Sequence, residues 1–131
     1  MNKYGNKYYN IKTKTTDGLV FDSYKEARRW EQLLLLQKAG EITELRRQVS
    51  YELIPAQYET YERYSESGKR LKDGVKLVER KAEYVADFVY HDVKTGELIV
   101  EDTKSPATKT KEYILKRKLM RLIHGIKIRE V

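Results

Sequence analysis

The strongest constraint on the fold is a pair of β-rich runs, residues 84–90 and 98–104, that carry charged side chains among apolar ones. The turn sequence Lys94-Thr95-Gly96 lies between them, so the two runs are predicted to pair as a β-hairpin. Side chains alternate across a strand. The second run therefore places one set of side chains on one face (Leu98, Val100, Asp102, Lys104) and another on the opposite face (Ile99, Glu101, Thr103).

The same alternation places Asp87 with Val85 and Val89, so Asp87, Asp102 and Lys104 are expected to converge on one patch. An aspartate buried without a partner is costly, so this patch needs a cation, either the lysine or a metal. A buried Asp87–Lys104 ion pair is one interpretation. Two acids beside a single lysine leave negative charge to be neutralised, which favours a metal site.

Composition limits the class of protein and its partners. The chain has 131 residues, enough for about one domain with one sizeable core, and a formal net charge of +7. Such a charge favours a polyanionic partner, with nucleic acid ranked ahead of a membrane surface. Many basic domains nevertheless bind no anion specifically. There is no cysteine and only two histidines, which excludes disulfides, thiolate metal sites and cysteine nucleophiles and disfavours a His-rich zinc site. No leader-like or membrane-length apolar run occurs, so we expect an intracellular, cytoplasmic protein.

The N-terminal region, residues 1–16, reads as a basic arm with interleaved tyrosines. It could contact phosphates and stack on bases, or it could be a frayed terminus that feeds one strand. Asp17-Gly18 is a turn signal, which predicts a hairpin over residues 11–21.

A helix is predicted from Ser23, where Ser-Xaa-Xaa-Glu fits a capping box, to Gly40. Glu26 lies on the stripe that contains Trp30 and Leu33, so two roles stay open for it. Its carboxylate could close the cap at Ser23, or it could point toward the sheet as a functional group.

The next run alternates apolar and polar residues through Leu53 and is predicted to be a half-buried strand that ends at Pro55. Gln48, at its start, is either a residue at the edge of the site or simply a polar strand start. Residues 57–81 are expected to form a long, mobile, lysine-rich loop or hairpin excursion. It could be a DNA-contacting flap or a solvated loop.

A second helix is predicted over residues 110–124, with Gly125 as its stop and one apolar face (Leu115, Leu119, Leu122, Ile123). Residues 126–131 follow as a short strand. Strand, helix and strand form a βαβ unit, so the last two strands should be parallel.

At this point the residues resemble a known group of enzymes. Asp87, separated by 14 residues from Asp102-Thr103-Lys104, resembles the PD-(D/E)XK nuclease superfamily. The longer runs Tyr84–Phe88, Val100–Lys104 and Tyr113–Lys118, with Ser23 and Glu26, are similar to a small phage and bacterial endonuclease-like family placed in that superfamily. Ala86 stands where the superfamily name has proline. The resemblance implies an α/β fold bordering on α+β, with a restriction-endonuclease-like αβββαβ core in which two helices flank a central mixed sheet, over residues 1–131 as a single domain.

The resemblance also implies the site. Asp87, Asp102, Lys104 and Glu26 would be catalytic, and the three acids among them would hold Mg²⁺ or Mn²⁺. If the strand register slipped by one residue, Glu101 would replace Asp102, but the shared face of Asp102 and Lys104 favours Asp102. The expected DNA contacts follow the site directly (Lys109, Lys111, Lys116, Arg117, Lys118).

The implied function is a metal-dependent DNA endonuclease, by analogy acting on branched or junction DNA. The alternative is a non-catalytic DNA-binding accessory protein of replication or recombination with a degenerate nuclease fold. DNA is the expected partner, with no membrane. A homodimer is expected because one site per chain needs a second copy to cut both strands. A phage-encoded chain would act in the host cell cytoplasm.

Overall fold

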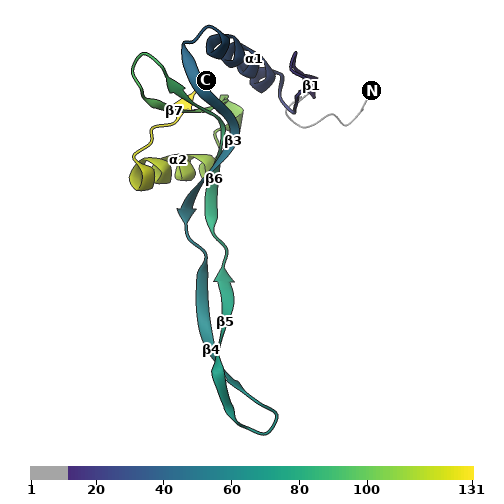
Figure 1. Cartoon of the computed structure of the whole chain (residues 1–131), viewed down its shortest axis with the longest axis vertical. Coiled ribbons are helices and arrows are strands. Elements are labelled where there is room, and N and C mark those ends of the chain that lie inside the picture. The colour runs from purple at the N-terminus through teal and green to yellow at the C-terminus, as the bar shows by residue number, and fades with distance from the viewer. Residues whose placement is uncertain (1–11) are drawn as a thin grey trace.

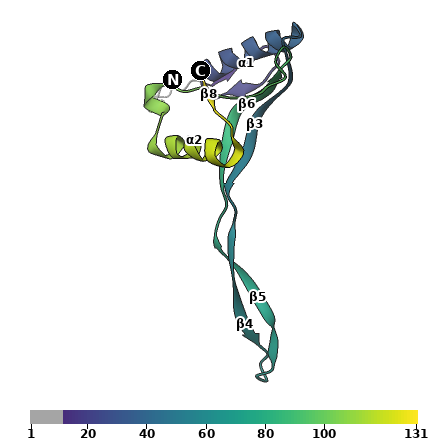
Figure 2. The same ribbon diagram turned by 90° about the vertical axis from the view of Figure 1, so that its left-hand side faces the viewer.

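A four-stranded mixed sheet with one helix on each face forms the body of the protein in the computed structural model, which describes residues 12–131 (Figures 1 and 2). The elements run in the order β1 (Thr13–Lys14), β2 (Val20–Phe21), α1 (Tyr24–Lys38), β3 (Ile42–Ile54), β4 (Gln57–Tyr64), β5 (Arg70–Glu79), β6 (Ala82–Asp92), β7 (Leu98–Asp102), the 3-10 turn η1 (Pro106–Thr108), α2 (Lys111–His124) and β8 (Arg129–Glu130). The strand order is β3-β6-β7-β8, and only the β7–β8 pair is parallel. The predicted mixed sheet flanked by two helices is confirmed, as is the parallel terminal strand.

Helix α1 forms where its caps and apolar stripe predict it. Ser23 is the N-cap and its hydroxyl accepts a hydrogen bond from the Glu26 backbone N–H, while Gly40 follows the helix with φ of 80°. Trp30 and Leu33 are buried, and the Trp30 ring stacks on Phe88 of β6 with centroids 5.7 Å apart. This aromatic contact anchors α1 on one face of the sheet.

Helix α2 packs on the other face, through Leu119 of the predicted apolar face and through residues that were not predicted. Tyr113 and Met120 are buried, whereas Leu115 and Leu122 are 58% and 80% exposed. The other three predicted residues are exposed, because apolar side chains lie all round this helix and periodicity could not select the buried side.

Strands β3 and β6 continue into a long arm formed by β4 and β5, which projects away from both helices (Figure 1). Among the described residues, β4 and β5 pair only with each other. Of the two forms expected for residues 57–81, a loop or a hairpin excursion, the structure shows the two-stranded hairpin. The turn that closes it, around Gly68, has the positive φ of 85° that glycine tolerates.

The predicted N-terminal hairpin is present as the antiparallel β1–β2 pair, and the indole of Trp30 donates to Asp17 in its turn (2.8 Å). Residues 1–11 of the expected basic arm lie outside the described residues. Within residues 12–131, no helix has the length and apolarity needed to cross a membrane.

Candidate metal and nucleic-acid site

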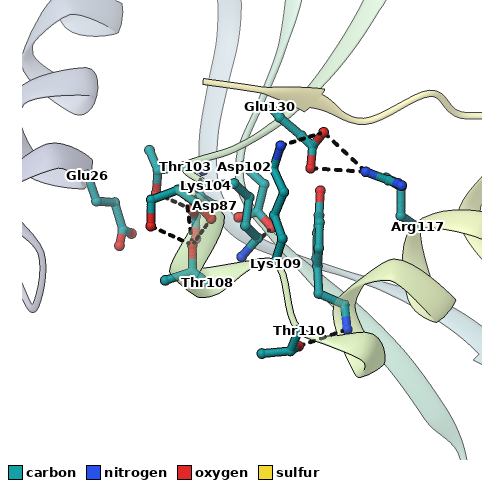
Figure 3. Close-up of polar contacts among 12 residues, drawn as sticks. Glu26, Asp87, Asp102, Thr103, Lys104, Thr108, Lys109, Thr110, Arg117 and Glu130 are labelled. Atoms are coloured by element: carbon teal, nitrogen blue, oxygen red, sulfur yellow. Dashed lines mark hydrogen bonds and ion pairs between the residues drawn. The ribbon is translucent and has the colours of Figure 1, made fainter. Parts of the chain in front are cut away.

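The structure brings Asp87, Asp102 and Lys104 together, as strand alternation predicted. Phe88 pairs with Glu101 in the β6–β7 register, so the next pair along sets Asp87 opposite Asp102. The Lys104 Nζ lies 3.2 Å from the Asp102 carboxylate, and the three side chains gather at the end of β7 (Figure 3). Two aspartates and one lysine therefore share a small volume.

Thr103 also belongs to this cluster, although alternation placed it on the opposite face. Its backbone N–H and its hydroxyl both donate to Asp87 Oδ2, at 2.9 and 2.7 Å. Because β7 ends at Asp102, the chain beyond it no longer follows the strand alternation. These two bonds fix the orientation of the Asp87 carboxylate, and no sequence signal pointed to them.

Burial and like charge act together on the acids of the site. Asp102 is only 3% exposed, and this burial, together with Asp87 beside it, raises the pKa of Asp102 to about 7. Lys104 opposes the rise without cancelling it. Burial and then the charge of Asp87 raise the pKa of Glu26 to about 7 as well. The site thus holds more acid than its lysine can neutralise.

Glu26 and Gln48 form the side of the site nearest α1. The Glu26 backbone completes the cap at Ser23, while its carboxylate points toward the Asp87 cluster and accepts a hydrogen bond from Gln48 at 3.5 Å (Figure 3). Helix capping and an inward carboxylate are therefore both features of this one residue. Gln48 lies opposite Asp87 in the β3–β6 register, and its φ of 54° is strained for a non-glycine residue in a strand. Such strain of about 1–3 kcal/mol is typical of functional sites.

Glu101 faces away from this cluster, which decides the register question in favour of Asp102. Its side chain is fully buried and accepts two hydrogen bonds from Arg29 of α1, at 2.6 and 2.8 Å. The Tyr90 hydroxyl donates to the same carboxylate. This network ties α1 to β7 on the face of the strand opposite Asp102.

Two buried tyrosines complete the wall beside Asp102 and were not predicted as site residues. The hydroxyls of Tyr84 and Tyr113 are buried next to the carboxylates of Asp102 and Glu130, respectively. Burial, and then the charge of Asp102, raises the pKa of Tyr84. Lys104 Nζ lies 4.4 Å from the centre of the Tyr113 ring, a cation–π contact that holds the lysine against α2.

A family model described as a protein of unknown function, DUF1064, matches residues 5–129. The chain belongs to the DUF1064 family. No curated protein and no solved structure matches it. The matched region contains Glu26, Asp87, Asp102 and Lys104, so the candidate site lies within the part of this DUF1064 chain that the family model covers.

The donor set of this DUF1064 site suits a hard divalent cation held partly by water. Within residues 12–131, no group of three or more histidine, cysteine or acidic side chains is arranged to enclose a metal. The protein would supply Asp87 and Asp102 directly, with Glu26 further out. Mg²⁺ is commonly bound by one or two carboxylates with several waters retained, so the residues fit that ion. The excess negative charge agrees with such an arrangement.

The basic residues predicted to contact DNA divide into two groups. Lys109 and Arg117 both pair with Glu130 of β8, at 3.7 and 3.2 Å, and Lys116 pairs with Glu112 at 3.2 Å. Lys111 and Lys118 are exposed on α2. A pocket of about 320 Å³ with several cations in its wall opens beside them (Arg117, Lys118, Arg121, Ile126, Lys127, Ile128, Glu130). The exposed lysines, rather than the paired cations, are those best placed for phosphate contact.

Proposed function

We propose that this protein is a divalent-metal-dependent DNA endonuclease. The observation that carries the proposal is the convergence of Asp87, Asp102 and Lys104 from adjacent strands, with two carboxylates set opposite each other in a buried sheet. Burying two acids in register is unfavourable unless a cation compensates them. One lysine offsets only half of that charge.

The surrounding side chains have separable tasks in phosphodiester hydrolysis. Bound Mg²⁺ or Mn²⁺ would polarise a phosphoryl oxygen and lower the pKa of a coordinated water. Thr103 holds Asp87 in one orientation, and Tyr113 holds Lys104 beside the site. From there the Lys104 ammonium would stabilise charge that develops on the phosphate. Glu26, with a pKa near neutrality, is suited to accept a proton from water.

DNA is the proposed substrate because the net charge of +7 and the exposed lysines of α2 suit phosphate. Branched or junction DNA is proposed from the resemblance of the motif alone. One observation favours the non-catalytic alternative: Lys104 already pairs with Asp102, as it would in a degenerate site closed by its own ion pair. In that case the protein would bind DNA as an accessory factor and would not cut it.

A nicking assay on supercoiled plasmid and on four-way junction DNA separates the two. Wild-type protein with Mg²⁺ or Mn²⁺ should cut, leaving 5′-phosphate ends, and Asp102→Ala should lose at least about a hundredfold in rate, as expected when a metal ligand is lost. Asp73→Asn, an exposed aspartate on β5, is the matched control and should cut normally. Equal background from wild type and Asp102→Ala on every substrate would reject the enzyme.

A further inference from the structure

The β4–β5 arm has a surface that nothing in the chain covers. All eight residues of β4 are exposed, and the arm points away from the sheet and both helices (Figures 1 and 2). An isolated two-stranded hairpin is only marginally stable in water. An arm of this length therefore calls for a partner.

One face of the arm is apolar. Tyr58 pairs across the hairpin with Leu77, and Thr60 pairs with Val75, so these four side chains share a face. Tyr58, Val75 and Leu77 are 62%, 64% and 51% exposed. On the opposite face the Tyr61 ring covers Gly74, where any Cβ would lie 2.3 Å from the ring.

The charge of the arm argues against nucleic acid as this partner. Residues 57–79 contain five acidic and five basic side chains (Glu59, Glu62, Glu66, Asp73, Glu79 against Arg63, Lys69, Arg70, Lys72, Lys76). The arm is thus neutral, whereas the whole chain carries +7. A polyanion would be drawn to the body of the protein and not to the arm.

The two edges of the arm differ in how they are protected against pairing. β5 has an extra residue relative to β4 between the pairs Tyr61–Gly74 and Arg63–Leu71, and it carries lysines and a glycine. Bulges and lysines are devices that block strand addition. β4 has no lysine, proline or glycine, so its outer backbone edge is open to another strand.

We propose that β4 pairs antiparallel with β4 of a second copy, with the two-fold axis at Tyr61. In this register Glu59 of each copy lies opposite the partner's Arg63, so the same ion pair forms twice, once on each side of the axis. Tyr58 lies opposite the partner's Tyr64 on the apolar face, so the two apolar faces merge into one side of a four-stranded sheet. A register shifted by one residue, with the axis at Glu62, would set Glu62 against the partner's Glu62, which like charge disfavours. The proposal does not rest on nuclease activity, because no residue of the candidate site lies in the arm.

Charge exchange tests the register. Wild type should sediment as a dimer, while Glu59→Arg and Arg63→Glu should each be monomeric, because each places like charges across the axis. An equimolar mixture of the two variants should dimerise again, since every cross-axis pair is then opposite in sign. A monomeric wild type at high micromolar concentration, or a mixture no more dimeric than its components, would overturn the proposal. Dimerisation that appears only after DNA is added would overturn it too, because DNA would then be the link.

Cysteine cross-linking tests the same axis independently of charge. The chain has no cysteine, so Tyr61→Cys provides one thiol per copy, and the two-fold sets the pair opposite each other at disulfide distance. Mild oxidation should cross-link Tyr61→Cys into a covalent dimer. Tyr58→Cys, on the same strand, would place its two thiols on the order of 20 Å apart and should stay uncrosslinked. Equal cross-linking of the two variants would contradict the axis.

Discussion

At the scale of single residues, Asp102 shows how the site is built at the expense of stability. Its pKa of about 7 lies well above its ordinary value of 3.8, because burial and Asp87 both disfavour its charge. An acid whose pKa rises on folding binds protons more tightly in the folded state. Its contribution to stability is therefore lost as the pH rises from about 4 toward 7, and does not return above that.

The replacement Asp102→Asn should remove this loss. With EDTA present, the free energy of unfolding of wild type should fall between about pH 5 and about pH 8. The free energy of unfolding of the variant should fall less over this range. At about pH 8 it should exceed that of wild type by roughly 1–3 kcal/mol. Urea unfolding across this pH range measures the difference. Asp73→Asn is the control for an exposed aspartate, and a wild-type pH dependence that Asp102→Asn leaves unchanged would contradict the assigned cause.

Strand alternation was enough to predict which acid faces the site. It separated Asp102 from Glu101, and the bidentate Arg29 contact confirms that Glu101 belongs to the opposite face. It failed at Thr103, which lies beyond the last residue of β7, where no strand geometry constrains the side chain. The strain at Gln48 was also invisible, because a positive φ at a glutamine has no sequence signature.

At the scale of elements, α2 presents the cations expected to meet DNA. Lys111 and Lys118 are exposed, whereas Lys109 and Arg117 are already engaged with Glu130. The double change Lys111→Gln/Lys118→Gln should lower DNA affinity roughly tenfold and reduce the salt slope by about 2. Fluorescence anisotropy in EDTA over a salt series measures both quantities.

The matched control has the same charge change in the arm, Lys72→Gln/Lys76→Gln. Because the arm is neutral overall and is assigned to a protein contact, this variant should bind DNA like wild type. Equal losses in the two double variants would show that only net charge matters, and not the position of α2.

The elements themselves were largely predictable, and their burial was not. Caps and glycine stops at Ser23, Gly40 and Gly125 located both helices to within a residue or two. The buried side of α2 was mispredicted because Leu115 and Leu122 compete with Tyr113 and Met120 for one sheet face. The sheet selects Tyr113, whose ring also contacts Lys104.

At the scale of the whole molecule, the β4–β5 arm extends from one end of the sheet, away from both helices (Figure 2). The order of strand, helix and strand predicted the parallel β7–β8 pair, because a βαβ unit places its two strands in parallel, while the mixed sheet flanked by two helices was implied by the resemblance. For the arm, the sequence left a loop and a hairpin excursion as equal alternatives. All residues of β4 are exposed, so apolar and polar side chains alternate only weakly along it. The proposed contact with a second copy lies outside the chain, and a single sequence does not reveal it.

The central claim is that Asp87 and Asp102 bind a metal cation, because Lys104 alone does not neutralise their charge. Calorimetric titration of Mn²⁺ at about pH 7.5 tests it most directly. Wild type should bind, and Asp102→Asn should bind at least about tenfold more weakly, as loss of a ligand requires, while Asp73→Asn binds like wild type. No binding to wild type, or equal binding to wild type and Asp102→Asn, would show that the cluster is a closed ion pair and would contradict the claim.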